Sequence, residues 1–343
     1  MTFEVPTRDD KPLWDVWLSM LWLPSVTAAD ELKIFDSLAE APATAAELAR
    51  RMDLNPRAVS GVLPLLAAQG FLACHEGRFA VSDTTRNFMV HSSPFYWGAV
   101  FIVQPRANAM HIRLREALVR KAALPMGQSS DKPPVESWES GQLDLERARG
   151  IAAFMQSHSL PAATGVARNG DFKGVTRLLD VGGGSGCFSI ALARLHANLR
   201  CTVMDLPAMC DVAREHIAAG KVADRVDARS VDMFREDWPR GYDAAFFSNI
   251  FHDWSFETCA QLAASAYKAL PSGGHVYLHE MLLDDGGTSP VTTAAFSVLM
   301  LLRTRGQQFT FTQLRALLQD AGFVDVEASA TYGYYSLIRA RRP

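Results

Sequence analysis

Residues 175–343 alternate between short apolar runs and amphipathic segments, a pattern that predicts alternating strands and helices. Strands are expected at 175–179, 199–204, 226–231, 244–247 and 275–280, followed by two short ones at 324–329 and 335–340. Helices are expected at 187–195, 207–219, 255–270 and 292–302, with a last one from 310. Because strands that alternate with helices form a mostly parallel sheet covered by those helices, the pattern predicts an α/β fold.

The first third of the chain is helical in its apolar period. A short amphipathic helix at 44–51 and a second helix from Asn55 precede two short strands at 70–74 and 77–81, which together form a winged-helix pattern. The stretch from Trp14 to Trp22 is too apolar to be left in water. Since large apolar patches are rare on monomers, we expect it to pack against a second subunit in a homodimer.

Charge and composition exclude several classes of protein. A winged helix alone suggests a DNA-binding regulator, but residues 1–110 hold nine basic and twelve acidic residues and the whole chain has a net charge of −3. A duplex-binding face should be basic, so no nucleic-acid partner is expected. No apolar run reaches the ~18 residues of a membrane span, and no signal peptide is evident. The five cysteines are scattered without a C-x-x-C pair, which favours a reduced cytoplasmic protein.

A glycine-rich turn, from Asp180 to Gly186, joins the first predicted strand of the α/β part to its helix. Glycine allows a left-handed backbone and lets a ligand approach closely. The spacing is D-x-G-x-G-x-G, and in the G-x-G-x-x-G frame of dinucleotide-binding proteins Cys187 replaces the last glycine. An NAD-dependent oxidoreductase is therefore disfavoured. An acid before the glycines suits a cofactor with a cationic amino group, whereas it would repel a pyrophosphate.

Polar residues recur at the carboxyl ends of the predicted strands: Asp180, Asp205, Asp232, His252 and Glu280. In a parallel sheet these ends share one edge, where ligands bind. Asp205 lies about 20 residues beyond the glycines, where an acid in nucleotide-binding folds binds ribose hydroxyls. The pattern predicts a ligand site at this edge.

Together these motifs resemble class I S-adenosylmethionine (SAM) methyltransferases, and in particular the two-domain plant and bacterial small-molecule O-methyltransferases of the caffeate and hydroxyneurosporene type. The resemblance implies a winged-helix dimerisation domain at 1–110, a helical connector lining the substrate pocket at 111–165, and a Rossmann-like SAM-binding catalytic domain at 166–343. It also implies methyl transfer from SAM, with S-adenosylhomocysteine (SAH) as product, to an aromatic hydroxyl of a small secondary metabolite.

The resemblance assigns the cofactor to a set of named positions. The glycine turn would hold the methionine end of SAM, Asp205 the ribose, and the acid-Met-Phe turn the adenine. In full, the expected cofactor-binding residues are Asp180, Gly182, Gly184, Gly186, Asp205, Leu206, Asp232, Met233, Phe234, Ser159, Ser248 and Trp254.

The catalytic and acceptor sites follow in the same way. The His-Asp-Trp motif of the family supplies the base, which is His252 here, oriented by Glu280. A phenol titrates near pH 10, and an imidazole can take its proton at neutral pH. The connector motif aligns on Met155, His158 and Ser159, so that Met155 and His158 would line the acceptor pocket. Met300 and Arg303 are further candidates for acceptor contacts, and an inward arginine would suit an acidic acceptor. The carboxylate spacing of a magnesium site is not evident, so no metal is expected.

Three positions depart from the family pattern: Ile151 replaces its Phe, Gln308 its Glu and Ser248 its Lys. The last two change the polarity around His252. Deprotonating a phenol also activates its ring carbons, so C-methylation of a hydroxylated ring stays open beside O-methylation. His275 and His279 alternate along one predicted strand with no evident partner, and no function is assigned to them.

Overall fold

The computed structural model describes residues 6–98, 100, 108–120, 138, 140–141 and 143–343. The chain divides into two compact units. The sheet unit comprises Met1–Lys11, Pro134–Leu282 and Phe311–Pro343, and the helical unit comprises Pro12–Pro133 and Leu283–Thr310. These bounds differ from the three-part division expected from the sequence, because the segment after the fifth large strand belongs to the helical unit. Of the expected connector, residues 121–137, 139 and 142 lie outside the described residues.

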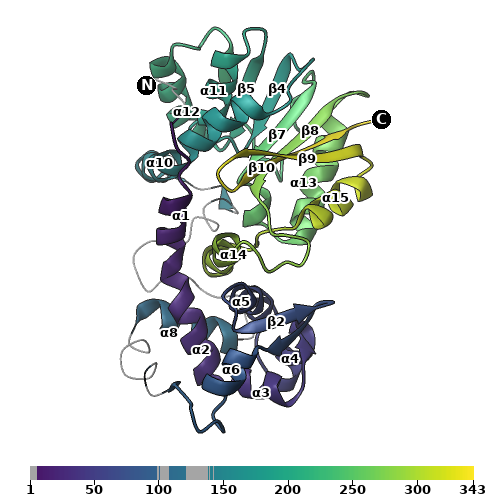
Figure 1. Ribbon diagram of the computed structural model, residues 1–343. Coiled ribbons are helices and arrows are strands. Elements are labelled where there is room, and N and C mark those ends of the chain that lie inside the picture. Colours follow the sequence, from purple (N-terminus) through teal and green to yellow (C-terminus); the bar gives the residue numbers. More distant parts are fainter. Residues whose placement is uncertain (1–5, 99, 101–107, 121–137, 139, 142) are drawn as a thin grey trace. The chain divides into compact units, whose positions relative to one another are not determined.

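A seven-stranded sheet forms the centre of the sheet unit, with strand order β6-β5-β4-β7-β8-β10-β9 (Figure 1). The pairs from β6 to β8 are parallel, and β10 runs antiparallel to both of its neighbours. The strands are β4 (Arg177–Val181), β5 (Arg200–Asp205), β6 (Val226–Ser230), β7 (Ala244–Ser248), β8 (His275–Met281), β9 (Val324–Tyr332) and β10 (Tyr335–Arg341). Every strand expected from the apolar runs is present, and the predicted α/β sheet is confirmed.

Helices cover both faces of this sheet. On one face α10 (Leu145–Asn169), α11 (Cys187–Leu195) and α12 (Pro207–Gly220) contact one another, and on the other α13 (Phe256–Ala269) contacts α15 (Phe311–Asp320) (Figure 1). A short 3-10 helix, η3 (Phe251–Asp253), follows β7. Because both faces are covered, the central strands are apolar throughout: Phe246, Phe247, Tyr277 and Leu278 are all buried.

The long helix α10 packs so closely against β9 that there is no room for a side chain at Gly165. A Cβ at Gly165 would lie 2.4 Å from the Cβ of Tyr332. Four residues further along, the Asn169 side-chain amide donates to the Thr331 carbonyl at 2.7 Å. A glycine inside a helix lowers its stability, so this residue is explained by the close packing of helix and strand.

The helical unit contains the expected winged-helix arrangement. Its elements are α1 (Lys11–Leu18, whose first residue lies in the sheet unit), η1 (Ser19–Leu21), α2 (Trp22–Glu31), α3 (Ile34–Glu40), β1 (Ala43–Thr44), α4 (Ala45–Met52), α5 (Pro56–Ala68), β2 (Leu72–His75), β3 (Arg78–Val81), α6 (Asp83–Phe88), α8 (Ala109–Val119) and α14 (Val291–Arg303). The small antiparallel sheet has the order β1-β3-β2. Thr44 and Glu47 form a capping box at α4, and Asn55 caps α5, which explains why these helices begin where they do.

Helix α14 joins this unit by packing against α5. The Arg57 guanidinium of α5 donates to the carbonyls of Leu301, Thr304 and Gly306 at 2.9–3.2 Å, at the end of α14. Burial lowers the pKa of Arg57 to about 10, so it remains charged at neutral pH. Three carbonyls of the returning segment are thereby held by one α5 side chain.

The apolar stretch near the N-terminus is divided between two environments. Trp14 is buried within its own chain, with its ring 5.2 Å from that of Trp17 and 5.4 Å from that of Phe296. Leu13 and Val16, on the same helix, are each 74% exposed. The expectation that the whole stretch packs on a partner is therefore wrong for Trp14. Among the helices that the structure describes, none is long and apolar enough to cross a bilayer.

Candidate active site

The turn between β4 and α11 has the left-handed backbone that its glycines predict. The φ angles of Gly182, Gly184 and Gly186 are 68°, 56° and 74°. A Cβ at Gly182 would lie 2.5 Å from Ile250 Cδ1, so a larger residue there would be both strained and obstructed. Gly186 has a different role. It precedes α11, and a Cβ there would lie 3.1 Å from Val203 of β5, so it permits helix–strand packing and does not line the pocket.

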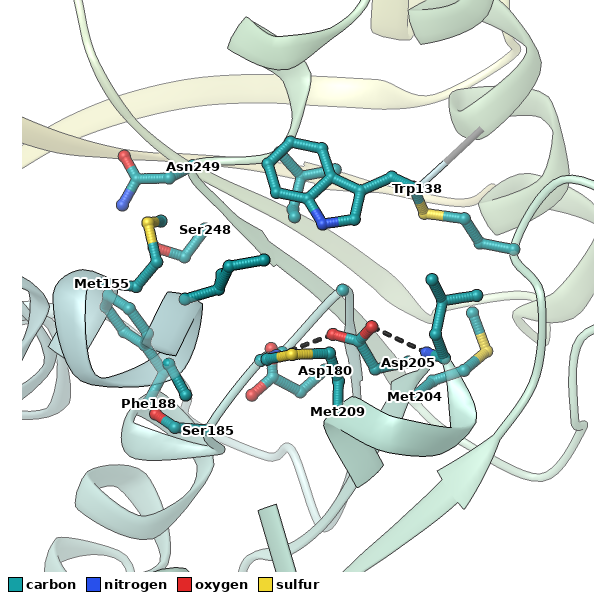
Figure 2. A pocket seen from close by; sticks show the side chains of 18 of the residues that line it. Trp138, Met155, Asp180, Ser185, Phe188, Met204, Asp205, Met209, Ser248 and Asn249 are labelled. Carbon is teal, nitrogen blue, oxygen red and sulfur yellow. Dashed lines mark hydrogen bonds between the residues drawn. The ribbon is translucent and has the colours of Figure 1, made fainter. Parts of the chain in front are cut away.

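A pocket opens at the carboxyl ends of β5, β4 and β7 (Figure 2). This is the switch point of the sheet, since the chain leaves β4 toward β5 on one side and returns to β7 on the other. It contains about 1020 Å³ of empty space, part of it open to solvent. All cofactor-binding candidates except Gly186 line it: Ser159, Asp180, Gly182, Gly184, Asp205, Leu206, Asp232, Met233, Phe234, Ser248 and Trp254.

Two buried carboxyl groups face this pocket. Ser189 Oγ donates to Asp180 Oδ2 at 2.7 Å, and burial raises the pKa of Asp180 to about 7. The backbone N–H groups of Gly184 and Leu206 donate to the two oxygens of Asp205 at 2.9 and 2.7 Å, and burial raises its pKa to about 6. Burial disfavours the charged form of both acids, and no neighbouring cation offsets the rise in their pKa values. They fit a ligand that brings positive charge and hydroxyl donors.

His252 and Glu280 come together next to the pocket. Glu280 Oε2 lies 2.9 Å from His252 Nδ1, while Oε1 accepts the backbone N–H groups of Ile250 and Phe251 at 3.1 and 3.0 Å. Burial lowers the pKa of His252, but the charges of Glu280 and Asp253 and the hydrogen bond to Glu280 outweigh it, so the net pKa is raised. His252 itself is not a lining residue, although Ile250 and Asp253 on either side are.

The acceptor candidates are distributed over both units. Met155 lines the pocket from α10, whereas His158 does not and lies edge-on to the Phe154 ring at 5.5 Å. Burial and the charge of His252 lower the pKa of His158 to about 4, which keeps it neutral and within electrostatic reach of His252. Met300 and Arg303 lie on α14 of the helical unit, so their contact with an acceptor stays a prediction.

Several lining residues were not predicted from the sequence: Trp138, Gln156, Gly183, Ser185, Phe188, Met204, Met209, Val231, Asn249 and Ile250. Most are apolar and resemble ordinary core residues, so their pattern gave no signal. Asn249 was detectable in principle. It follows Ser248 directly, just after the predicted strand 244–247, and that place at a strand end was the signal. In the structure its φ of 55° lies in the left-handed region where asparagine is enriched.

The expectation that His279 has no partner is wrong. Its ring nitrogens lie 3.0 Å from Ser248 Oγ and 3.0 Å from Thr331 Oγ1. Ser248 is directly opposite His279 in the parallel pairing of β7 with β8. That pairing depends on strand order and register, and neither can be predicted from the alternation of residues along a single strand.

Comparison with known families matches both parts of the chain. Residues 127–324 match the model of the O-methyltransferase domain, and residues 17–91 match that of the O-methyltransferase dimerisation domain. The chain belongs to the O-methyltransferase family. It is a SAM-dependent methyltransferase, as the resemblance of its motifs implied.

Individual relatives cover nearly the whole methyltransferase. The 3-hydroxy-5-methyl-1-naphthoate 3-O-methyltransferase of Streptomyces sahachiroi is 34% identical over 89% of this chain and 87% of its own. An O-methyltransferase family 2 protein from Planctomyces limnophilus, solved with apigenin, has a TM-score of 0.86 at 26% identity and covers 99% and 98% of the two chains. Human N-acetylserotonin methyltransferase, solved with SAM, shares the fold with a TM-score of 0.60 at 22% identity, covering 99% of each chain.

Proposed function

We propose that this methyltransferase transfers a methyl group from SAM to a hydroxyl group of a small aromatic molecule, with His252 as the general base. The observation that carries the proposal is the buried pair of His252 and Glu280, 2.9 Å apart, beside a pocket suited to a cationic cofactor. The naphthoate enzyme named above acts on an aromatic hydroxyl, and the apigenin complex holds a hydroxylated aromatic compound.

The cofactor would lie along the strand ends of the sheet unit. SAM supplies a methyl group already activated by its sulfonium. The glycine turn with Asp180 would hold the amino-acid end, and Asp205, fixed by two backbone N–H groups, would accept the ribose hydroxyls. Phe234 and Trp254, whose rings lie 4.7 Å apart, would flank the adenine together with Asp232. The chemistry fits, because burial without a partner raises the pKa of both acids, and the cofactor would bring positive charge to Asp180 and hydroxyl donors to Asp205.

Glu280 would act as a positioning residue for the base. Its Oε1 is occupied by two backbone N–H groups, so Oε2, 2.9 Å from Nδ1 of His252, would accept the proton on that nitrogen. The lone pair of the neutral ring is then on Nε2, the nitrogen that can take a proton from an acceptor hydroxyl. The acid of a hydrolytic triad has the same role, because it also fixes the tautomer and the orientation of its histidine.

In the sheet unit, the acceptor would contact α10. Met155 lines the pocket on α10, and His158 follows one turn later, neutral because of its lowered pKa. We propose Met300 and Arg303 as acceptor contacts from the helical unit. We also propose a homodimer through the dimerisation domain matched at residues 17–91, in which Leu13 and Val16, exposed just before that range, would be covered.

The test is a screen of phenols, flavonoids and hydroxynaphthoates with SAM. Mass spectrometry detects one added methyl group, and long-range proton–carbon NMR shows whether it lies on oxygen or on carbon. With the best acceptor, His252→Ala should lower kcat by about 10²–10⁴ while SAH binding measured by calorimetry is kept. His216→Ala, on α12 outside the pocket, is the matched control and should keep full activity. Unchanged turnover in His252→Ala would refute the base, and a carbon-bound methyl would refute O-methylation.

A further inference from the structure

The geometry points to His279 as a positioning residue that fixes the Ser248 hydroxyl as a hydrogen-bond acceptor for the ammonium group of the bound cofactor. This inference rests on the cofactor placement proposed above. It concerns three side chains on three strands: Ser248 at the end of β7, His279 in β8 and Thr331 in β9.

The three side chains form a continuous hydrogen-bonded chain that starts at the pocket wall. Ser248 lines the pocket, and its Oγ lies 3.0 Å from His279 Nδ1. The other ring nitrogen, Nε2, lies 3.0 Å from Thr331 Oγ1, which in turn lies 3.1 Å from the Tyr335 carbonyl oxygen. The His279 ring is fully buried and stacks on the Tyr335 ring at 4.8 Å and 11°. Packing therefore holds the imidazole in one orientation.

The direction of every proton in this chain follows from its far end. A carbonyl oxygen can only accept, so the hydroxyl proton of Thr331 points to Tyr335. If Thr331 donated to the ring instead, its oxygen would face the carbonyl oxygen with lone pair against lone pair. Nε2 of His279 must therefore carry a proton and donate it to Thr331 Oγ1.

A neutral imidazole has one N–H, so Nδ1 of His279 is left as an acceptor. Burial lowers the pKa of His279 to about 3, which keeps the ring neutral throughout the working pH range of an enzyme. Ser248 must then donate its own proton to Nδ1. Its oxygen presents only lone pairs to the pocket, and it can bind a donor there but not another acceptor.

The position of Ser248 selects which part of the cofactor it meets. Asp205, the proposed ribose ligand, ends β5 on one side of β4, whereas Ser248 ends β7 on the other side. In Figure 2, Ser248 and Asn249 lie at the end of the pocket away from Met204. The pairing of Asp180 with Phe246 places Ser248 two residues further on, beside the glycine turn. The amino-acid end of the cofactor carries one donor, the ammonium, and one acceptor, the carboxylate. An oxygen that only accepts favours the ammonium.

The first experiment reads the tautomer directly. Histidine labelled with ¹⁵N is incorporated into the whole protein, and two-bond proton–nitrogen correlations distinguish a protonated ring nitrogen from a bare one. The His279 signals, assigned from their shift in Thr331→Ser, should show a protonated Nε2 and a bare Nδ1. A protonated Nδ1, or a doubly protonated ring, would overturn the inference whatever the enzyme binds.

The second experiment compares two ligands that differ in the amino-acid part. Calorimetry measures the Kd of SAH and of 5′-methylthioadenosine, which lacks both the ammonium and the carboxylate. Ser248→Ala should weaken SAH binding about tenfold, as expected for a hydrogen bond to a charged group, and leave methylthioadenosine binding unchanged. Thr331→Val, which removes the acceptor that sets the ring, should also weaken SAH selectively, and Thr331→Ser should restore it.

The two ideas fail in different ways. Equal losses for both ligands would mean that these residues only maintain the fold, and the positioning role would be wrong while the cofactor site stands. If wild-type protein bound neither ligand, the cofactor placement itself would fail, and the inference with it. Stronger SAH binding by Ser248→Ala would show that the hydroxyl oxygen opposes a ligand acceptor, which contradicts the proposed partner.

Discussion

The substitution Glu280→Gln tests the most specific claim about the proposed base, namely that its tautomer is imposed. In the native protein Oε1 of Glu280 accepts two backbone N–H groups, from Ile250 and Phe251, and Oε2 lies 2.9 Å from His252 Nδ1, where it is proposed to hold the ring proton. Glutamine has the same shape but one acceptor and one donor in place of two acceptors. Its carbonyl oxygen can satisfy either the backbone pair or the histidine, and its NH₂ must face the other.

The backbone pair decides the outcome. If the amide oxygen keeps both N–H groups, the NH₂ faces Nδ1 of His252, and the ring proton moves to Nε2, where the base needs a lone pair. To recover the productive tautomer, the amide must turn and leave two N–H groups unpaired, that of Phe251 buried and that of Ile250 partly buried. Each costs about 1–3 kcal/mol, so the productive form lies about 2–6 kcal/mol higher. At about 1.4 kcal/mol for each factor of ten, we expect kcat to fall by about 30-fold to 10⁴-fold.

The assay is kcat and kcat/KM with the best acceptor from the screen, over about pH 6 to 9, with SAH affinity measured in parallel. His252 is active when unprotonated and its pKa is raised, so the acid limb of the native profile should lie above the ordinary histidine value of about 6.5. Because the charge of Glu280 raises the pKa of His252, its loss in Glu280→Gln should move the acid limb of any residual activity to lower pH. Glu257→Gln, at the exposed start of α13, is the matched control. A folded Glu280→Gln variant with kcat within about threefold of native would refute the imposed tautomer.

The remaining predictions concern the pocket, the fold and the assembly. In the free protein the pKa values of Asp180 and Asp205 are about 7 and 6, and a ligand that brings an ammonium group and hydroxyl donors favours their charged forms. SAH binding should therefore release protons and weaken as pH falls from about 7 to 5, which calorimetry in two buffers of different ionisation enthalpy detects. Gly165→Ala should destabilise the protein by about 1–3 kcal/mol in urea unfolding, because its Cβ would lie 2.4 Å from Tyr332. Gly150→Ala, on the same helix with open space around it, should stabilise it by up to about 1 kcal/mol. Val16→Asp, at a position 74% exposed, should shift a dimer toward monomer in analytical ultracentrifugation without unfolding it.

Each of these has an outcome that contradicts it. Proton uptake on SAH binding would mean that the bound ligand does not favour the charged forms of the two acids. Equal stabilities for the two alanine variants would show that α10 can move away from β9 at no cost. A Val16→Asp variant that remains dimeric would place the subunit contact elsewhere on the dimerisation domain.

Much of the site could be predicted because it depends on local chemistry. The D-x-G-x-G-x-G turn needs left-handed residues at fixed positions, and the observed φ angles of Gly182, Gly184 and Gly186 follow from that. Parallel connectivity brings the carboxyl ends of successive strands to one edge, so Asp180 and Asp205 were expected to share a pocket, and they do. Period and composition were also sufficient for the strands of the sheet and for the winged helix.

Other features depend on contacts between distant segments, and only the tertiary structure decided them. Gly186 has the same conformation as its neighbours in the turn, yet it faces Val203 and not the pocket, because the next helix starts there. Residues 283–310 belong to the helical unit because α14 packs on α5, which no local pattern could show.

Strand β8 separates most clearly what the sequence determines from what the tertiary structure determines, because its His275 and His279 look alike in sequence. Hydrophobic period and glycine spacing are properties of neighbouring residues, and the sequence by itself therefore determined the strands, the turn and the edge where the cofactor is expected. A hydrogen-bond network is a property of register. His279 finds Ser248, 31 residues away, and Thr331, 52 residues away, only when the four strands β7, β8, β10 and β9 are aligned side by side. The folded sheet therefore decided that the Ser248 hydroxyl donates to His279 and presents its lone pairs to the pocket. The reason is that the Tyr335 carbonyl on β10 can only accept, and this fixes the direction of each hydrogen bond in the network.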